Sequence, residues 1–127
     1  MTGIEIFKTA CAFLATQMED NTELEPIALA WLNSLLAEAL PYENAHRTER
    51  KLPLLAGAPL LTGFAEVIPY CEDIMRIALP FGLAAYLFME DESFGMAAEF
   101  RNRYLSALYE AAPLTAQKTL DVYGGEV

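Results

Sequence analysis

The sequence of 127 residues contains one histidine and two cysteines, which leaves little material for a catalytic or metal-binding site. With His46 as the single histidine, every motif that needs two of them is excluded, including the HExxH zinc pattern. Cys11 and Cys71 form neither a metal-binding pattern nor a disulfide framework, and each lies in an apolar stretch. A Cys–His enzyme would have to use His46, and the carboxylates that follow Cys71 disfavour its thiolate. We therefore expect a non-enzyme without a metal or cofactor.

Basic side chains are scarce as well. Eight Lys and Arg residues oppose eighteen Asp and Glu residues, so the net charge is −10. This charge argues against binding a nucleic-acid backbone through a basic surface and against docking on anionic lipid. The longest apolar run, residues 77–89, contains Pro80 and is too short to span a bilayer. No signal-peptide pattern is visible either, so we expect no membrane association.

Apolar residues, in contrast, are abundant and make up 54% of the chain. This fraction is above the usual range for a soluble domain. One interpretation is an oligomer or a partner that covers apolar surface. The other is a well-filled helical core with many alanines, and both stay open.

The periodicity of the apolar residues predicts four helices in a mainly α fold. They span residues 4–18, 22–40, 71–90 and 94–112. A capping box at Thr22 begins the second helix and Pro41 ends it. Pro80 should kink or split the third helix, and Ser93 can cap the fourth. Short turns favour a four-helix up-down bundle, with residues 1–113 as one domain and 114–127 as a tail.

The connection at residues 41–70 is the least ordinary part of the chain. Its polar first part, 42–51, is interpreted as either a short helix or a surface loop. The apolar part, 52–70, carries prolines and glycines that forbid a long helix and allow a short hairpin. It is either an interaction segment or a loop folded over the core. The candidate interface residues are Leu54, Leu55, Leu60, Leu61 and Phe64, together with Val122 and Tyr123 of the tail. The tail could extend another chain's sheet or be a frayed end.

Charged residues gather at the two ends of the predicted bundle. In an up-down arrangement, the first and third turns share one end and the second lies at the other. The acidic end holds Glu19, Asp20, Glu90, Asp91 and Glu92, and the locally basic end holds Arg47, Arg50 and Lys51. Such polarity suits stacking between protein layers. Helix capping explains part of the acidic set equally well, but it does not explain Glu19 and Asp20.

Residues 68–104 carry a recognisable pattern. It comprises Ile-Pro-Tyr-Cys-Glu-Asp at 68–73, Ala-Leu-Pro-Phe-Gly-Leu-Ala-Ala-Tyr-Leu-Phe at 78–88, Glu-Asp-Glu at 90–92 and Ala-Ala-Glu-Phe-Arg-Asn-Arg-Tyr at 97–104. This part resembles the head–tail connector (adaptor, or head-completion) proteins of tailed phages and prophages. The first two helices agree with that family in kind only.

The resemblance implies a non-catalytic structural subunit of an oligomeric ring between head portal and tail. Its partners would be copies of itself and other phage components such as the portal and tail proteins. DNA would pass through the ring without specific binding. The protein would occupy the bacterial cytoplasm during assembly and then the virion. The alternative is a small bacterial adaptor or regulatory helical bundle that binds one partner protein through its apolar loop.

Overall fold

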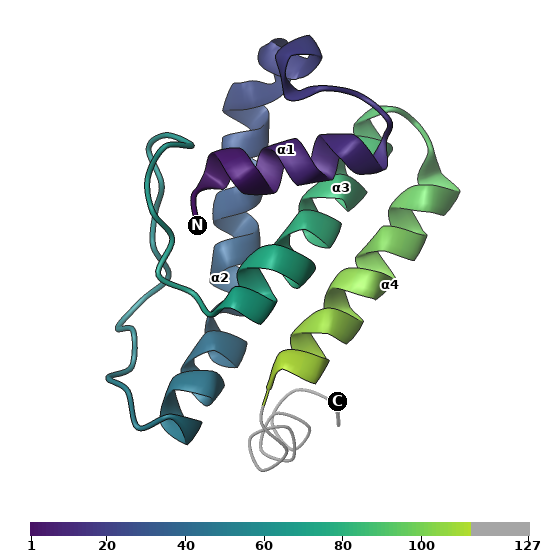
Figure 1. Ribbon diagram of the computed structural model, residues 1–127. Coiled ribbons are helices and arrows are strands. Elements are labelled where there is room, and N and C mark those ends of the chain that lie inside the picture. Colours follow the sequence, from purple (N-terminus) through teal and green to yellow (C-terminus); the bar gives the residue numbers. More distant parts are fainter. Residues whose placement is uncertain (113–127) are drawn as a thin grey trace.

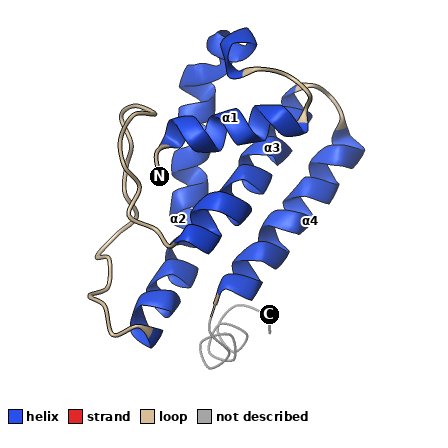
Figure 2. Cartoon of the chain, viewed as in Figure 1, coloured by secondary structure: helices blue, strands red, loops and turns tan. Residues whose placement is uncertain are grey.

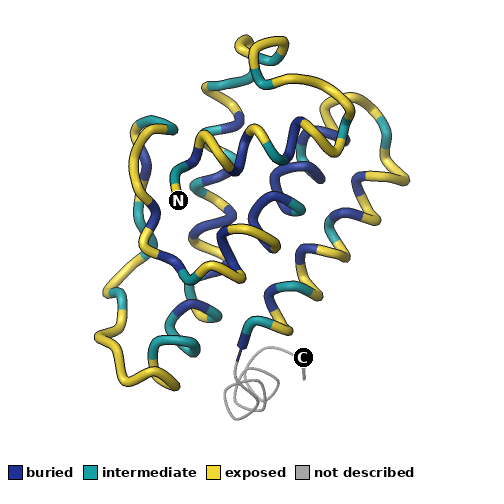
Figure 3. Tube along the Cα trace, viewed as in Figure 1, coloured by how far each residue is buried: buried dark blue, intermediate teal, exposed yellow. Residues whose placement is uncertain are grey.

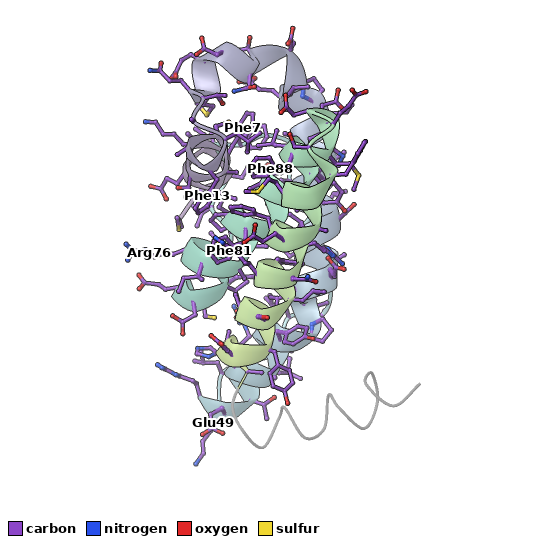
Figure 4. The ribbon with its side chains drawn as sticks, turned by 90° about the vertical axis from the view of Figure 1, so that its right-hand side faces the viewer. Phe7, Phe13, Glu49, Arg76, Phe81 and Phe88 are labelled. Carbon is purple, nitrogen blue, oxygen red and sulfur yellow. The ribbon has the colours of Figure 1, made fainter. Side chains whose placement is uncertain are left out.

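The computed structural model describes residues 1–112, and it is a mainly helical bundle with no β-strand in this range (Figures 1 and 2). Its helical elements are α1 (Gly3–Phe13), the 3₁₀ segment η1 (Met18–Leu24), α2 (Glu25–Glu49), the π-helical turn η2 (Ile74–Ala78), α3 (Leu79–Glu90) and α4 (Phe94–Ala111). α2, α3 and α4 lie alongside one another, and α1 crosses them; Figure 4 shows α1 almost end-on. The predicted helical bundle is confirmed. Val122, Tyr123 and the rest of the predicted tail lie outside the described residues.

α3 is the central helix of the core. It packs against α1, α2 and α4, and most of its residues are buried (Figure 3). An apolar helix of this kind must be covered on all sides, as the sequence predicted. Gly82 permits the close approach, because a Cβ there would lie 2.8 Å from the Leu35 side chain and 2.9 Å from that of Tyr104. No helix within residues 1–112 is long and apolar enough to cross a membrane.

The first helix is shorter than predicted. α1 ends at Phe13, and Ala15 adopts a left-handed conformation with φ of 58°. The backbone N–H of Thr16 then donates to the Cys11 carbonyl at 3.1 Å, which closes the helix with a Schellman-type turn. Residues 18–24 form η1 instead of continuing α1. The capping box predicted at Thr22 is wrong, because α2 begins after Leu24.

The second helix is longer than predicted. α2 continues through Pro41 to Glu49, so the expected end at residue 40 is wrong, and the polar stretch that follows is largely helical. A proline inside a helix removes one backbone hydrogen bond and crowds the preceding turn. Side chains of residues 43–47 offset this cost by binding the segment that follows α2. We call that segment, residues 50–71, the connecting loop.

η2 and α3 together form the predicted third helix, whose first part is a π-helical turn. Pro80 lies in the first turn of α3, directly after η2, where a proline is well tolerated. Phe81 on this helix faces Phe13 of α1, with ring centroids 5.4 Å apart (Figure 4). The same Phe13 ring contacts Phe100 of α4 at 5.1 Å. These rings fasten α1 across the α3–α4 layer.

Candidate interaction surface

A buried ionic cluster on α2 holds both ends of the connecting loop. Glu43 is 2% exposed, and its carboxylate accepts hydrogen bonds from Nε of Arg47 and from the backbone N–H of Cys71, both at 2.7 Å. Arg47 in turn donates to the carbonyl oxygens of Pro53 at 2.9 Å and Pro69 at 2.7 Å. Two side chains one helical turn apart therefore join the start and the end of the loop.

Two asparagines of α2 fix the interior of the loop. The Asn44 side chain accepts from the backbone N–H of Leu55 at 2.9 Å and donates to its carbonyl at 3.1 Å. Asn33 holds Leu61 in the same way, at 2.8 and 3.0 Å. Each amide thus satisfies both backbone groups of one loop residue, as a neighbouring strand would. The loop is irregular in shape but has a defined path.

The loop also packs against the beginning of α1. The backbone N–H of Ile4 donates to the Phe64 carbonyl at 3.0 Å, and the N–H of Ile68 donates to the Met1 carbonyl at 3.1 Å. The Phe64 ring stacks on Phe7 with centroids 5.1 Å apart. Residues distant in the sequence therefore hold the loop from two sides. The short hairpin that the sequence allowed does not form a β-ladder. Within residues 50–71 the structure has a single isolated β-bridge, in which Val67 pairs with Thr2 near the N-terminus.

Burial divides the predicted interface residues into two groups. Leu61 is 5% exposed and belongs to the core, while Leu55 and Phe64 are partly buried against it. Leu61 therefore attaches the loop to the core, and Leu55 and Phe64 present only part of their surfaces to solvent. Leu54 is 59% exposed and Leu60 is 78% exposed. They remain the candidate contact residues.

We give the name loop face to the four large apolar side chains of the loop that are exposed: Leu52, Leu54, Leu60 and Val67. The backbone beneath them is held by the asparagines and by the Glu43–Arg47 pair. A surface whose backbone is already ordered loses less conformational entropy when it binds. Exposed large apolar side chains that gather into a patch commonly mark protein–protein contacts. The sequence signal for the anchors was present, because Glu43 and Arg47 stand four residues apart on one helix face.

The residues of the two predicted charged ends lie at opposite ends of the molecule. The turn after α3 and the η1 segment lie near the same end of the molecule in Figure 1, and Figure 4 places Glu49 at the opposite end. Arg47 differs from the prediction, because its charge is paired with Glu43. Only two of the predicted basic residues are exposed, Arg50 and Lys51. The predicted acidic residues are all exposed: Glu19, Asp20, Glu90, Asp91 and Glu92.

Two titratable groups at the end of the loop, Tyr70 and Cys71, favour their neutral forms. Burial raises the pKa of the Cys71 thiol, and Glu43 and Asp73 raise it further. Burial, with the nearby Glu43 carboxylate, also raises the pKa of the Tyr70 hydroxyl, which donates to the Leu36 carbonyl at 2.5 Å. These groups are placed for packing and hydrogen bonding. Within residues 1–112, no group of three or more His, Cys, Asp or Glu side chains is arranged to hold a metal ion.

No protein-family model matches the chain, and neither a curated protein nor a solved structure is significantly similar to it.

Proposed function

We propose that this chain is a non-catalytic assembly protein, specifically a subunit of the oligomeric ring that connects head and tail in a tailed phage or prophage particle. The observation that carries the assembly role is the loop face, an apolar surface on a loop whose path is fixed by Glu43, Arg47 and two asparagines. The resemblance in residues 68–104 supports the phage assignment.

In this proposal the loop face contacts a neighbouring copy or the portal. The helices alternate in direction, with a bend near Pro80, and their charged ends orient successive protein layers. DNA passes through the ring with few phosphate partners, since the chain carries a net charge of −10. The protein acts in the bacterial cytoplasm during assembly and then in the virion.

The test combines gene context with reconstitution. We expect capsid, portal and terminase genes beside the gene for this chain. Mixing the full chain with that portal protein should give a ring on the portal by electron microscopy, even if the chain alone is monomeric. If those genes are absent and the chain instead forms a one-to-one complex with a cellular protein, the adaptor alternative is correct and the ring is refuted.

A further inference from the structure

An apolar groove lies between α3 and α4 near the turn that joins them. Its volume is about 370 Å³. Ala97 and Ala98 line its α4 side, while Met89 and Phe94 stand at its rim with 55% and 62% of their surfaces exposed. Tyr86 and Arg101 line it farther from the turn. From Phe94 to Arg101 the groove follows α4 for about 10 Å, which is two helical turns.

The walls of the groove are fixed by contacts with α2. Both terminal nitrogens of Arg101 bind the Glu38 carboxylate, so this guanidinium is already paired. The Tyr86 ring stacks on Trp31 with centroids 5.3 Å apart and planes within 6° of parallel. The groove is therefore preformed, and its one cation is satisfied within the chain.

The open end of the groove is acidic. Glu90, Asp91 and Glu92 form the turn between the two rim residues, and all three are exposed. Lys and Arg are absent from residues 77–100 and also from residues 9–46, which include η1 at the same end of the molecule. Nothing basic from these segments offsets the carboxylates. A ligand of this groove therefore meets an apolar wall beside a cluster of three exposed carboxylates.

We propose that the groove binds an amphipathic helix of a partner protein, with apolar anchors on one face and Lys or Arg beside them. Two helical turns accommodate anchors at i, i+3 or i+4, and i+7, which is how helices bind apolar grooves. The carboxylates select a basic helix and disfavour a second copy of this acidic chain. The inference rests on the proposed role in protein assembly but holds for any particle or partner.

The test uses the full chain and two synthetic amphipathic helical peptides, one of Leu and Lys and one of Leu and Glu. Ala98→Trp fills the groove, and because Ala98 is exposed the new side chain does not enter the core. Ala12→Trp is the matched control, on an exposed position of α1 that does not line the groove. We expect the Lys peptide to bind the wild type. Its affinity for Ala98→Trp should be at least ten-fold lower, and its affinity for Ala12→Trp should equal that for the wild type.

A second pair of variants tests the charge. Neutralising the turn by Glu90→Gln, Asp91→Asn and Glu92→Gln should weaken Lys-peptide binding and reduce its salt dependence. The control neutralises three exposed carboxylates outside this turn, Glu49, Glu72 and Asp73, and should bind as the wild type does.

Equal binding of the two peptides, or equal binding by Ala98→Trp and Ala12→Trp, overturns the inference. Self-association of the wild type that Ala98→Trp alone abolishes overturns it too, because the occupant is then a second copy. If Ala98→Trp still forms a normal ring on the portal, the groove is not a contact there and the proposed function stands. If the Lys peptide binds as expected but no ring forms, the groove inference stands and the proposed function fails.

Discussion

Replacing Glu43 with alanine should release the connecting loop and lower the free energy of unfolding substantially. The change leaves the backbone N–H of Cys71 without its acceptor and removes the carboxylate from Arg47, whose side chain is 17% exposed. Breaking a buried ion pair by removing one partner costs about 3–5 kcal/mol. Arg47 keeps its bonds to two loop carbonyls, so we expect the lower end of that range, about 3 kcal/mol.

Urea unfolding followed by circular dichroism measures this change. Glu43→Gln keeps an acceptor for the backbone N–H and loses only the charge, so it should cost less, about 1.5–3 kcal/mol. Glu49→Ala is the control on the same helix, because Glu49 is exposed; it should stay within about 0.5 kcal/mol of the wild type.

Trypsin gives a local readout of the same change. Arg50 and Lys51 stand at the beginning of the loop and are exposed. Glu43 orients Arg47, which holds Pro53 just after this segment, so trypsin should cleave Glu43→Ala faster than Glu49→Ala, since cleavage follows local opening. If the free energy of unfolding of Glu43→Ala lies within about 1 kcal/mol of the wild-type value, Glu43 does not hold the loop, because breaking a buried ion pair costs more than that.

Three further predictions concern helix ends, packing and pH. Ala15→Gly should stabilise the protein by about 1 kcal/mol because Ala15 has φ of 58°. Ala12→Gly, inside α1, should destabilise it by about the same amount. If urea unfolding shows that both variants change the free energy of unfolding in the same direction, the prediction is wrong. Gly82→Ala should lower the free energy of unfolding by about 1–3 kcal/mol, since the new Cβ would lie 2.8 and 2.9 Å from the Leu35 and Tyr104 side chains. Gly95→Ala should not lower it, because no atom lies within 4 Å of a Cβ there. Equal melting temperatures of the two variants would refute the packing argument. Hydrogen bonds from Arg101 of α4 lower the pKa of Glu38. The wild type should therefore be more stable than Glu38→Gln at neutral pH, by about 0.2–1 kcal/mol at this partly exposed site. This difference should disappear as the pH falls through the lowered pKa of Glu38. A difference that grows in acid would reverse the assigned sign.

The helices were predictable because their apolar periodicity is strong, and their ends were not. Pro41 is a reliable sign of a helix end in local terms, yet α2 passes through it because Asn44 and Arg47 bind a loop that comes later in the sequence. Ala15 gives no local signal for a left-handed residue, since glycine usually occupies that position. Tertiary contacts explain the end of α2, whereas α1 ends in a local backbone turn.

The interaction surface was predictable as a segment but not residue by residue. Prolines and glycines at residues 53–69 marked an irregular apolar connection. Irregular backbone has no fixed period, so the sequence could not separate inward Leu61 and Phe64 from outward Leu54 and Leu60. The spacing of Glu43 and Arg47 was the available clue to the anchor, although the same spacing is also found in solvent-exposed pairs.

Binding of the portal protein by a loop-face variant shows whether the loop face is the assembly contact. Leu60→Ser changes the most exposed of the apolar loop residues, and Leu105→Ser is the control on α4, where the side chain is 41% exposed. We expect Leu60→Ser to bind the portal at least ten-fold more weakly than the wild type while its urea unfolding is unchanged. Leu105→Ser should bind the portal as the wild type does. Equal portal binding by Leu60→Ser and the wild type would contradict the loop face as the assembly contact.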